Sequence, residues 1–304
     1  MYEQIAANKR KTFFLIFGFV VLLFLVGAAF DLLLRGGVIG LVVVAVIVIV
    51  SSVGSYYNSD KAALAISHAK PADPKQYARL YNLVEGLCIS GGLPQPRLYI
   101  IDDPAPNAFS TGRNPKHAAV AVTTGLLENM NRVELEGVLA HELSHIRNYD
   151  ILVMTLTVTM VGMIALLSDF FLRFMFFGGR RDNNDSNNPI AFVFMIFGFI
   201  LLIFAPIIAY IMQFAVSRRR EYLADASGAQ LTRYPPGLIS ALEKLKADDT
   251  SIHSASKATA HLWIEEPLDK TSNKGNKRLN HLFDTHPPLD DRIRALQAMW
   301  WQAM

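Results

Sequence analysis

The chain has 304 residues, 52% of them hydrophobic, and its mean hydropathy of +0.27 is too high for an ordinary soluble enzyme. Its formal net charge of +3 is small, and its basic residues form short clusters without interleaved aromatics, which argues against nucleic-acid binding. Cys88 is the only cysteine, so an internal disulfide and a cysteine-rich zinc site are both excluded. Because Cys88 lies in an apolar helical stripe, we expect it to be a buried small side chain.

Residues 1–59 are predicted to form a pair of membrane-spanning helices. Residues 13–30 contain no charged side chain, and after Asp31 and Arg35 neither do residues 36–59. Each run is long enough to cross a bilayer, and the short turn between them predicts a helical hairpin. A cleaved signal peptide fits poorly, because a second span follows at once and no small-residue cleavage site stands out.

Residues 60–150 are predicted to be the first part of a soluble domain. A helix is expected over residues 74–90. Strands are expected over residues 97–101 and 118–123, with a turn-rich stretch between them. These elements predict an α+β domain with a small sheet.

Residues 151–217 form a second hydrophobic region. Residues 151–168 and 190–217 are free of charge, and a polar segment with several arginines separates them. Two more membrane spans and a tightly packed apolar hairpin are the interpretations that this pattern leaves open.

Residues 218–304 are predicted to be the second part of the soluble domain. A helix of small residues, EYLADASGAQ, begins at Glu221, and an amphipathic helix covers residues 238–246. Residues 269–280 are polar, and we expect them to be a mobile loop and the first soluble segment cut by an added protease. A terminal helix follows the sequence THPP, with Thr285 as its cap and proline in its first turn.

Basic residues beside the hydrophobic runs predict the orientation in the membrane. Residues 9–11 precede the first run and residues 218–220 follow the last, and all six are lysine or arginine. The positive-inside rule places both clusters in the cytoplasm. Arg173 and the pair at residues 180–181 would then lie on the opposite side.

The strongest motif is the sequence AHELSHIRNY, in which His141, Glu142 and His145 have the spacing H-E-x-x-H. On a helix, residues four apart lie on one face about a turn from each other, so both imidazoles can reach one metal ion. This helix is expected to begin near Asn131 or Arg132. Glu142 falls within its apolar stripe, and a buried carboxylate beside a metal could take a proton from water. The alternative is an ordinary amphipathic helix with a chance match.

A third ligand must come from elsewhere in the chain, since a catalytic zinc usually takes three protein ligands and leaves a fourth position for water. The candidates downstream are Glu221, Asp225, Glu243, His253, His261, His281 and His286. Glu221 and Asp225 share one helix face, and the small residues around them would let that helix pack closely against another. The alternative is a solvated pair on a surface helix.

Two further polar residues have two interpretations each. Asn107 could direct a loop through an Asx turn, or help present a strand edge to a substrate. His286 precedes two prolines and could be either a fixed donor near the site or a capping residue.

These motifs together resemble the HtpX-type membrane zinc metalloproteases, which are relatives of the CAAX prenyl proteases. The likeness rests on HELSHIRNYD, on RRREYLADASGA after the last hydrophobic run, on NAF at residues 107–109 and on THPP at residues 285–288. It covers nearly the whole chain. It implies a mainly α membrane protein, in which transmembrane helical hairpins carry a zincin-like (gluzincin) α+β catalytic domain with a small sheet.

The resemblance also implies the site and the setting. It assigns His141, His145 and Glu221 as ligands of one Zn²⁺ per chain and Glu142 as the catalytic base. It further implies a multi-pass protein of the bacterial cytoplasmic membrane with its protease domain facing the cytoplasm. Its expected partners are the lipid bilayer and polypeptide substrates, namely misfolded or damaged membrane proteins cut in stress-linked quality control.

Distance from the membrane favours Glu221 over Asp225 as the third ligand. Glu221 follows the end of the uncharged run at Ser217 by four residues, which is roughly 6 Å along a helix. His145 precedes Ile151 by six residues, roughly 9 Å by the same rise, so the two side chains can meet. Asp225 would lie about 6 Å farther out. We expect it instead to hydrogen-bond the outer nitrogen of a ligating histidine.

The expected reaction is Glu-assisted attack of a zinc-activated water on a peptide bond, with His286 as the candidate donor to the oxyanion. An intramembrane protease is disfavoured because Arg132, Glu134 and other charges surround the motif. The alternative function is a membrane-anchored chaperone or adaptor with a structural zinc, which would not need a glutamate beside an open metal position. A transporter would need polar residues within its first two spans.

Overall fold

The computed structural model describes residues 2–34, 37–160, 162, 218–250, 252, 254–256, 259–265 and 287–303. The helices are α1 (Tyr2–Leu34), α2 (Gly37–Ile66), α3 (Ala78–Gly91), α4 (Thr124–Asn129), α5 (Arg132–Arg147), α8 (Arg218–Thr232), α9 (Pro235–Ala247) and α11 (Leu289–Ala303), with short 3-10 helices at η1 (Pro115–His117) and η2 (Ala260–Leu262). The strands are β1 (Lys70–Pro71), β2 (Arg97–Ile101), β3 (Ala108–Gly112) and β4 (Ala118–Thr123). A further apolar helix covers Asp150–Met160.

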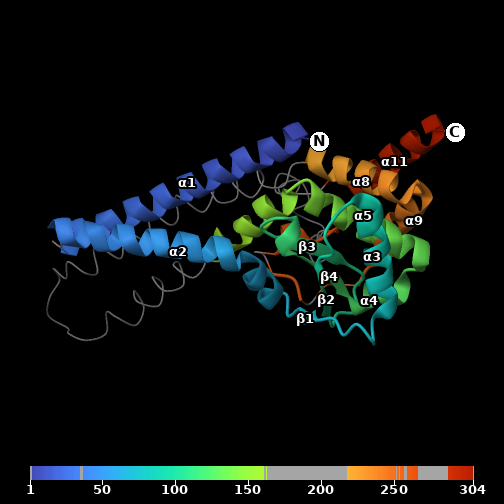
Figure 1. Cartoon of the computed structure of the whole chain (residues 1–304), viewed down its shortest axis with the longest axis horizontal. Coiled ribbons are helices and arrows are strands. Elements are labelled where there is room, and N and C mark those ends of the chain that lie inside the picture. The colour runs from blue at the N-terminus through green and yellow to red at the C-terminus, as the bar shows by residue number, and fades with distance from the viewer. Residues whose placement is uncertain are drawn as a thin grey trace, which may run out of the picture.

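Helices α1 and α2 lie side by side and extend away from the rest of the described structure (Figure 1). Among the described residues, α2 is the one helix that is long and apolar enough to cross a membrane. The membrane-spanning hairpin therefore stays a prediction. The second hydrophobic pair lies outside the described residues, except for its beginning at Asp150–Met160, whose side chains are mostly buried.

The sheet has the strand order β1-β2-β4-β3. Strands β2 and β4 have the predicted bounds and pair in parallel, with Arg97 opposite Ala119. The stretch between them, expected to be turn-rich, contains β3, which pairs antiparallel with β4. All five residues of β3 are buried. Its sequence AFSTG therefore lacks the alternation of polar and apolar side chains that indicates a half-exposed strand, and the strand was not predicted.

Helix α5 lies at the centre of the helical layer that covers one face of the sheet, with α3, α8 and α9 packed around it (Figure 1). It begins at Arg132, as predicted, because the Asn131 side chain accepts hydrogen bonds from the backbone N–H groups of Val133 and Glu134. The Glu134 carboxylate in turn accepts from the Asn131 N–H and completes a capping box. Burial alone would raise the pKa of Glu134, but bonds from Lys244 and its other donors lower it. This network fixes the start of α5 against α9.

Two glycines let neighbouring helices approach α5 closely. A Cβ at Gly228 of α8 would lie 3.0 Å from the backbone nitrogen of His141, and one at Gly137 of α5 would lie 2.7 Å from the backbone nitrogen of Leu238. The small-residue helix therefore packs directly on the HExxH segment, as its sequence predicted. Cys88 is buried in the same core, and burial raises the pKa of its thiol to about 11.

Candidate metal centre

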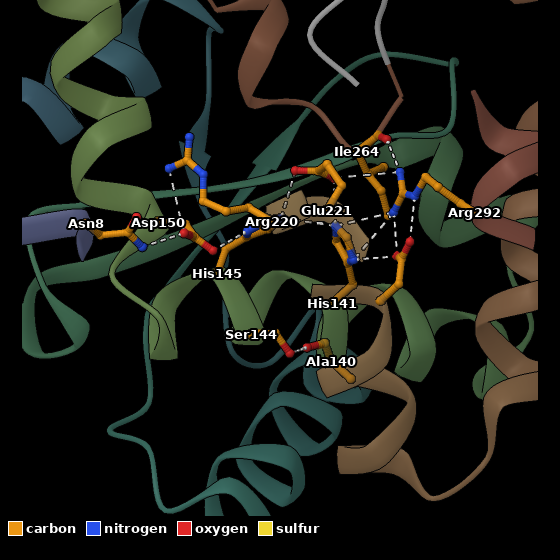
Figure 2. A network of polar contacts seen from close by, with 11 residues as sticks. Asn8, Ala140, His141, Ser144, His145, Asp150, Arg220, Glu221, Ile264 and Arg292 are labelled. Atoms are coloured by element: carbon orange, nitrogen blue, oxygen red, sulfur yellow. Dashed lines mark hydrogen bonds and ion pairs between the residues drawn. The ribbon is translucent and has the colours of Figure 1, made fainter. Parts of the chain in front are cut away.

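His141 and His145 extend from successive turns of α5 toward Glu221, which comes from the first turn of α8 (Figure 2). The three side chains are almost completely buried. The two Nε2 atoms lie 3.1 Å apart, and the Glu221 carboxylate oxygens lie 3.6 Å from His141 Nε2 and 3.5 Å from His145 Nε2. The structure thus brings together the three residues proposed as ligands, in a group that could hold a metal ion.

The spacing of these atoms fits a small tetrahedral cation. Ligand bonds of about 2.0–2.2 Å at tetrahedral angles place the ligand atoms roughly 3.3–3.6 Å from one another. The three distances, 3.1, 3.5 and 3.6 Å, are close to that range.

Each histidine has a carboxylate behind it. Asp225 Oδ1 lies 2.9 Å from His141 Nδ1, and Asp150 Oδ2 lies 3.1 Å from His145 Nδ1. A carboxylate can only accept, so each Nδ1 donates its proton, and a ring that is neutral directs its Nε2 lone pair toward the other ring. Two lone pairs and a carboxylate at such short distances repel one another unless a cation lies among them, so the donor set fits a metal ion.

Glu142 lies on the same helix between the two histidines and is 1% exposed. Its Oε2 atom is buried and has no hydrogen-bond partner among the described residues. A buried carboxylate oxygen without a partner is costly, and a polar ligand of the site, such as water, would compensate it. Glu142 therefore offers a buried carboxylate oxygen that could accept a hydrogen bond from such a ligand.

Arg292 of α11 also belongs to the site, although the sequence patterns did not predict it. Its side chain is fully buried and donates to both oxygens of Asp225, from Nε at 2.8 Å and from Nη2 at 2.7 Å. Its Nη1 donates to the backbone oxygen of Ile264 and lies 3.9 Å from Glu221 Oε2. The sequence does carry a signal for this residue. Arg292 lies within the apolar stripe of α11 that Leu289, Ile293 and Leu296 form, and a charge in such a stripe indicates a buried partner. Glu142 has the same kind of position in α5.

The charges of the site stabilise ionised groups despite burial. Burial alone would lower the pKa of His141, but the Asp225 and Glu221 carboxylates raise it to about 9. Burial would raise the pKa of Asp225, but Arg292 and His141 lower it to about 2. The carboxylates therefore favour positive charge at this site, and a metal that binds there would have to displace a proton from His141.

The remaining predicted site residues have different outcomes. Asp225 makes the expected contact with the outer nitrogen of a histidine. Asn107 is fully buried and lies at the start of β3, where its amide donates to the backbone oxygen of Glu265 at 2.8 Å and accepts from the N–H of Ala108 at 3.0 Å. It thereby joins β3 to residues 263–265, a segment that also pairs with β3. His286 and Thr285 lie outside the described residues, as does the loop at residues 269–280.

The buried helix with two histidines one turn apart, the adjoining glutamate and the carboxylate from a second helix define the class of HExxH metalloproteases. The chain belongs to Peptidase family M48, whose sequence profile matches residues 74–300. The resemblance to HtpX-type proteases is thereby confirmed, and the protein is a metalloprotease.

Relatives of known name match almost the whole chain. A "Protease HtpX homolog" of Caldanaerobacter subterraneus subsp. tengcongensis is 44% identical over 98% of both chains. A second, from Limosilactobacillus reuteri, is 46% identical over 98% of this chain and 100% of the relative. The crystal structure of S. mikatae Ste24p has a similar fold, with a TM-score of 0.54 and 20% sequence identity. The match covers 97% of this chain and 67% of the Ste24p chain.

Proposed function

We propose that this protein is a membrane-anchored zinc endopeptidase in which His141, His145 and Glu221 hold one Zn²⁺ per chain and Glu142 is the general base. The observation that carries this proposal is the convergence of the three buried ligand atoms. Glu142 follows His141 directly on the same helix, and its buried Oε2 has no hydrogen-bond partner among the described residues. When bound, zinc supplies Lewis-acid chemistry that acidifies water and polarises a peptide carbonyl.

The chain's own residues then move the proton and hold the site. Glu142 accepts a proton from the attacking water and returns it to the amine that leaves. Asp225 and Asp150 accept the Nδ1 protons of the two imidazoles, which leaves each Nε2 for the metal and fixes the planes of the rings. Asn107 as a substrate contact and His286 as the donor to the oxyanion remain parts of the proposal.

The apolar surface of the helix pair supports a place in the membrane. Several large side chains of α2 are more than half exposed, and those of Ile47, Ile49 and Val50 are examples. On α1, Phe13 and Leu25 are also more than half exposed. A continuous apolar surface of this kind is favourable in lipid and unfavourable in water.

The two soluble parts share one side of that membrane in this proposal. Helices α5 and α8 both supply ligands and pack on each other, so the chain between them crosses an even number of times or not at all. The basic residues at 9–11 and 218–220 favour the cytoplasmic side of a bacterial membrane. The likeness to HtpX-type proteases further suggests misfolded or damaged membrane proteins as substrates, in stress-linked quality control.

The test uses the full chain, purified in detergent, with an unfolded substrate protein and with chelator or added zinc. Cleavage should require zinc. Glu142→Gln should keep its zinc and lose cleavage by about 10²–10⁴-fold, because the amide has the shape of the base without its proton affinity. Glu136→Gln is the matched control, since Glu136 lies on the same helix outside the metal group.

Near-wild-type cleavage by Glu142→Gln at equal zinc content would reject the mechanism. Zinc bound by the wild type without any cleavage of unfolded or membrane substrates would favour the adaptor function instead.

A further inference from the structure

The N-terminal end of α1 reaches the metal centre. Asn8 is five residues ahead of the first uncharged run, and its side chain is 4% exposed. Its Nδ2 donates to Asp150 Oδ1 at 2.7 Å and to the backbone oxygen of Asn148 at 2.9 Å. Both partners are acceptors, and a side-chain amide nitrogen carries two protons, so both of its donors are used and its orientation is defined.

Asp150 connects this amide to a proposed metal ligand. One of its oxygens accepts from Asn8, and the other lies 3.1 Å from His145 Nδ1 (Figure 2). Arg220 Nη1 lies 3.7 Å from the oxygen that Asn8 contacts. Asp150 is 1% exposed, so its carboxylate contacts protein groups rather than bulk water.

The turn that carries Asp150 is shaped by the same end of α1. Tyr149 has a φ of 59°, a left-handed conformation that residues with a Cβ disfavour. Lys9 Nζ lies 4.8 Å from the centre of the Tyr149 ring, next to the Asn8 contact with Asn148. Two consecutive residues of α1 therefore hold two consecutive residues of a turn that is unfavourable by itself.

The geometry points to Asn8 as a positioning residue of the metal centre, which acts through Asp150 to hold the His145 ring with Nε2 toward the other two ligands. The first helix of the hairpin is then a structural part of the site as well as an anchor. This inference rests on the metal site of the proposed function, and it adds a residue that lies 137 positions before the ligand that it orients.

Zinc affinity of the full chain in detergent, measured by competition with a chelator, tests this role. Asn8→Ala should weaken zinc binding about tenfold, the lower end of the range for a lost outer partner of a metal-binding histidine. Asn58→Ala is the matched control, because Asn58 is an exposed residue of α2 whose amide donates to Gly54 of its own helix. The control should bind zinc as the wild type does.

A double-mutant comparison separates positioning from a general loss of structure. If Asn8 acts through Asp150, Asn8→Ala should have no further effect on zinc affinity in an Asp150→Ala background, but its full effect in an Asp225→Ala background. The absorption spectrum of the Co²⁺-substituted protein, which depends on ligand geometry, should change in Asn8→Ala and not in Asn58→Ala.

Three results would overturn the inference. They are an affinity change of less than twofold in folded Asn8→Ala, an unchanged effect in the Asp150→Ala background, and loss of the fold in both Asn8→Ala and the volume-matched Asn8→Leu. The last would make Asn8 a residue of the fold. A wild type that binds no zinc would instead reject the proposed function, so the two failures are distinguishable.

Discussion

The two histidines of the metal centre are supported from behind in different ways. His141 has Asp225 behind it, and the guanidinium of Arg292 donates to both oxygens of that carboxylate. His145 has Asp150 behind it, and the main donor to that carboxylate is the neutral amide of Asn8. We refer to these as the arginine arm and the asparagine arm.

The arms also differ in where they come from. The arginine arm joins α8 and α11, whereas the asparagine arm joins α1 to Asp150, the first residue of the apolar helix that follows α5. One histidine is therefore fixed by the folding of the protease domain, and the other also depends on how the first helix of the hairpin docks. Removing one partner of a buried charge pair strongly destabilises the protein, because the other charge stays buried without compensation. Removing a neutral donor lowers the stability less. The arms should therefore respond differently to mutation.

The largest effect is expected at Glu221, the proposed ligand whose carboxylate faces both histidines. Glu221→Ala should lose most of its zinc at micromolar supply, because one of three ligands is gone. Asp225→Ala should weaken zinc binding by about 10- to 100-fold, since only the support of a ligand is lost. Metal analysis of both purified variants checks this order. Full occupancy in Glu221→Ala, or a larger loss in Asp225→Ala, would place the third ligand elsewhere.

The second effect separates the arms by stability. Arg292→Met should lower the free energy of unfolding by about 3–5 kcal/mol, because Asp225 would remain as a buried charge without its guanidinium. Arg294→Met on the same helix is the control, since Arg294 is exposed and should change stability by no more than about 0.5 kcal/mol. Thermal or denaturant unfolding of chelator-treated protein measures both. Equal stability of the two variants would show that the arginine arm does not stabilise the fold.

Much of this site could be predicted from local sequence patterns. The HExxH spacing placed His141 and His145 together, and the small residues after Glu221 predicted the close helix packing that brings it to them. The bounds of β2 and β4 followed from apolar runs between turn residues. These features depend on neighbours within a few positions, which is the range over which periodicity carries information.

The parts that were missed depend on contacts between distant segments. Asn8 lies in a short polar stretch before the first apolar run, and nothing local distinguishes it from a solvated residue. Asp150 and Arg292 carried a weaker signal, a charge at the edge of an uncharged run and a charge inside an apolar stripe. Strand β3 was hidden because burial on both faces removes alternation from its sequence. All four features, the three residues and the strand, depend on burial by segments that are distant in the sequence.

The third effect tests whether the two arms support their ligands equally. Asp150→Ala should weaken zinc binding by about 10- to 100-fold, in the same range as Asp225→Ala, because each carboxylate fixes one ring through Nδ1. Chelator competition measures both. Asp102→Ala serves as the control because Asp102 is exposed. A wild-type affinity for Asp150→Ala would mean that His145 is oriented by its packing alone.

The smallest effect concerns the neutral donor of the asparagine arm. A tenfold loss of zinc affinity in Asn8→Ala corresponds to about 1.4 kcal/mol, and saturating zinc stabilises a protein in proportion to the logarithm of its affinity. The stabilisation that zinc confers should therefore be about 1.4 kcal/mol smaller in Asn8→Ala than in the wild type and unchanged in Asn58→Ala. In the absence of zinc, Asn8→Ala should destabilise the fold less than Arg292→Met, because Arg220 remains 3.7 Å from the Asp150 carboxylate. Unfolding measured with zinc and with chelator separates the two contributions. An equal zinc-induced stabilisation in Asn8→Ala and the wild type would show that the hairpin contributes to the fold alone, and that the metal centre is supported entirely by the elements outside the hairpin.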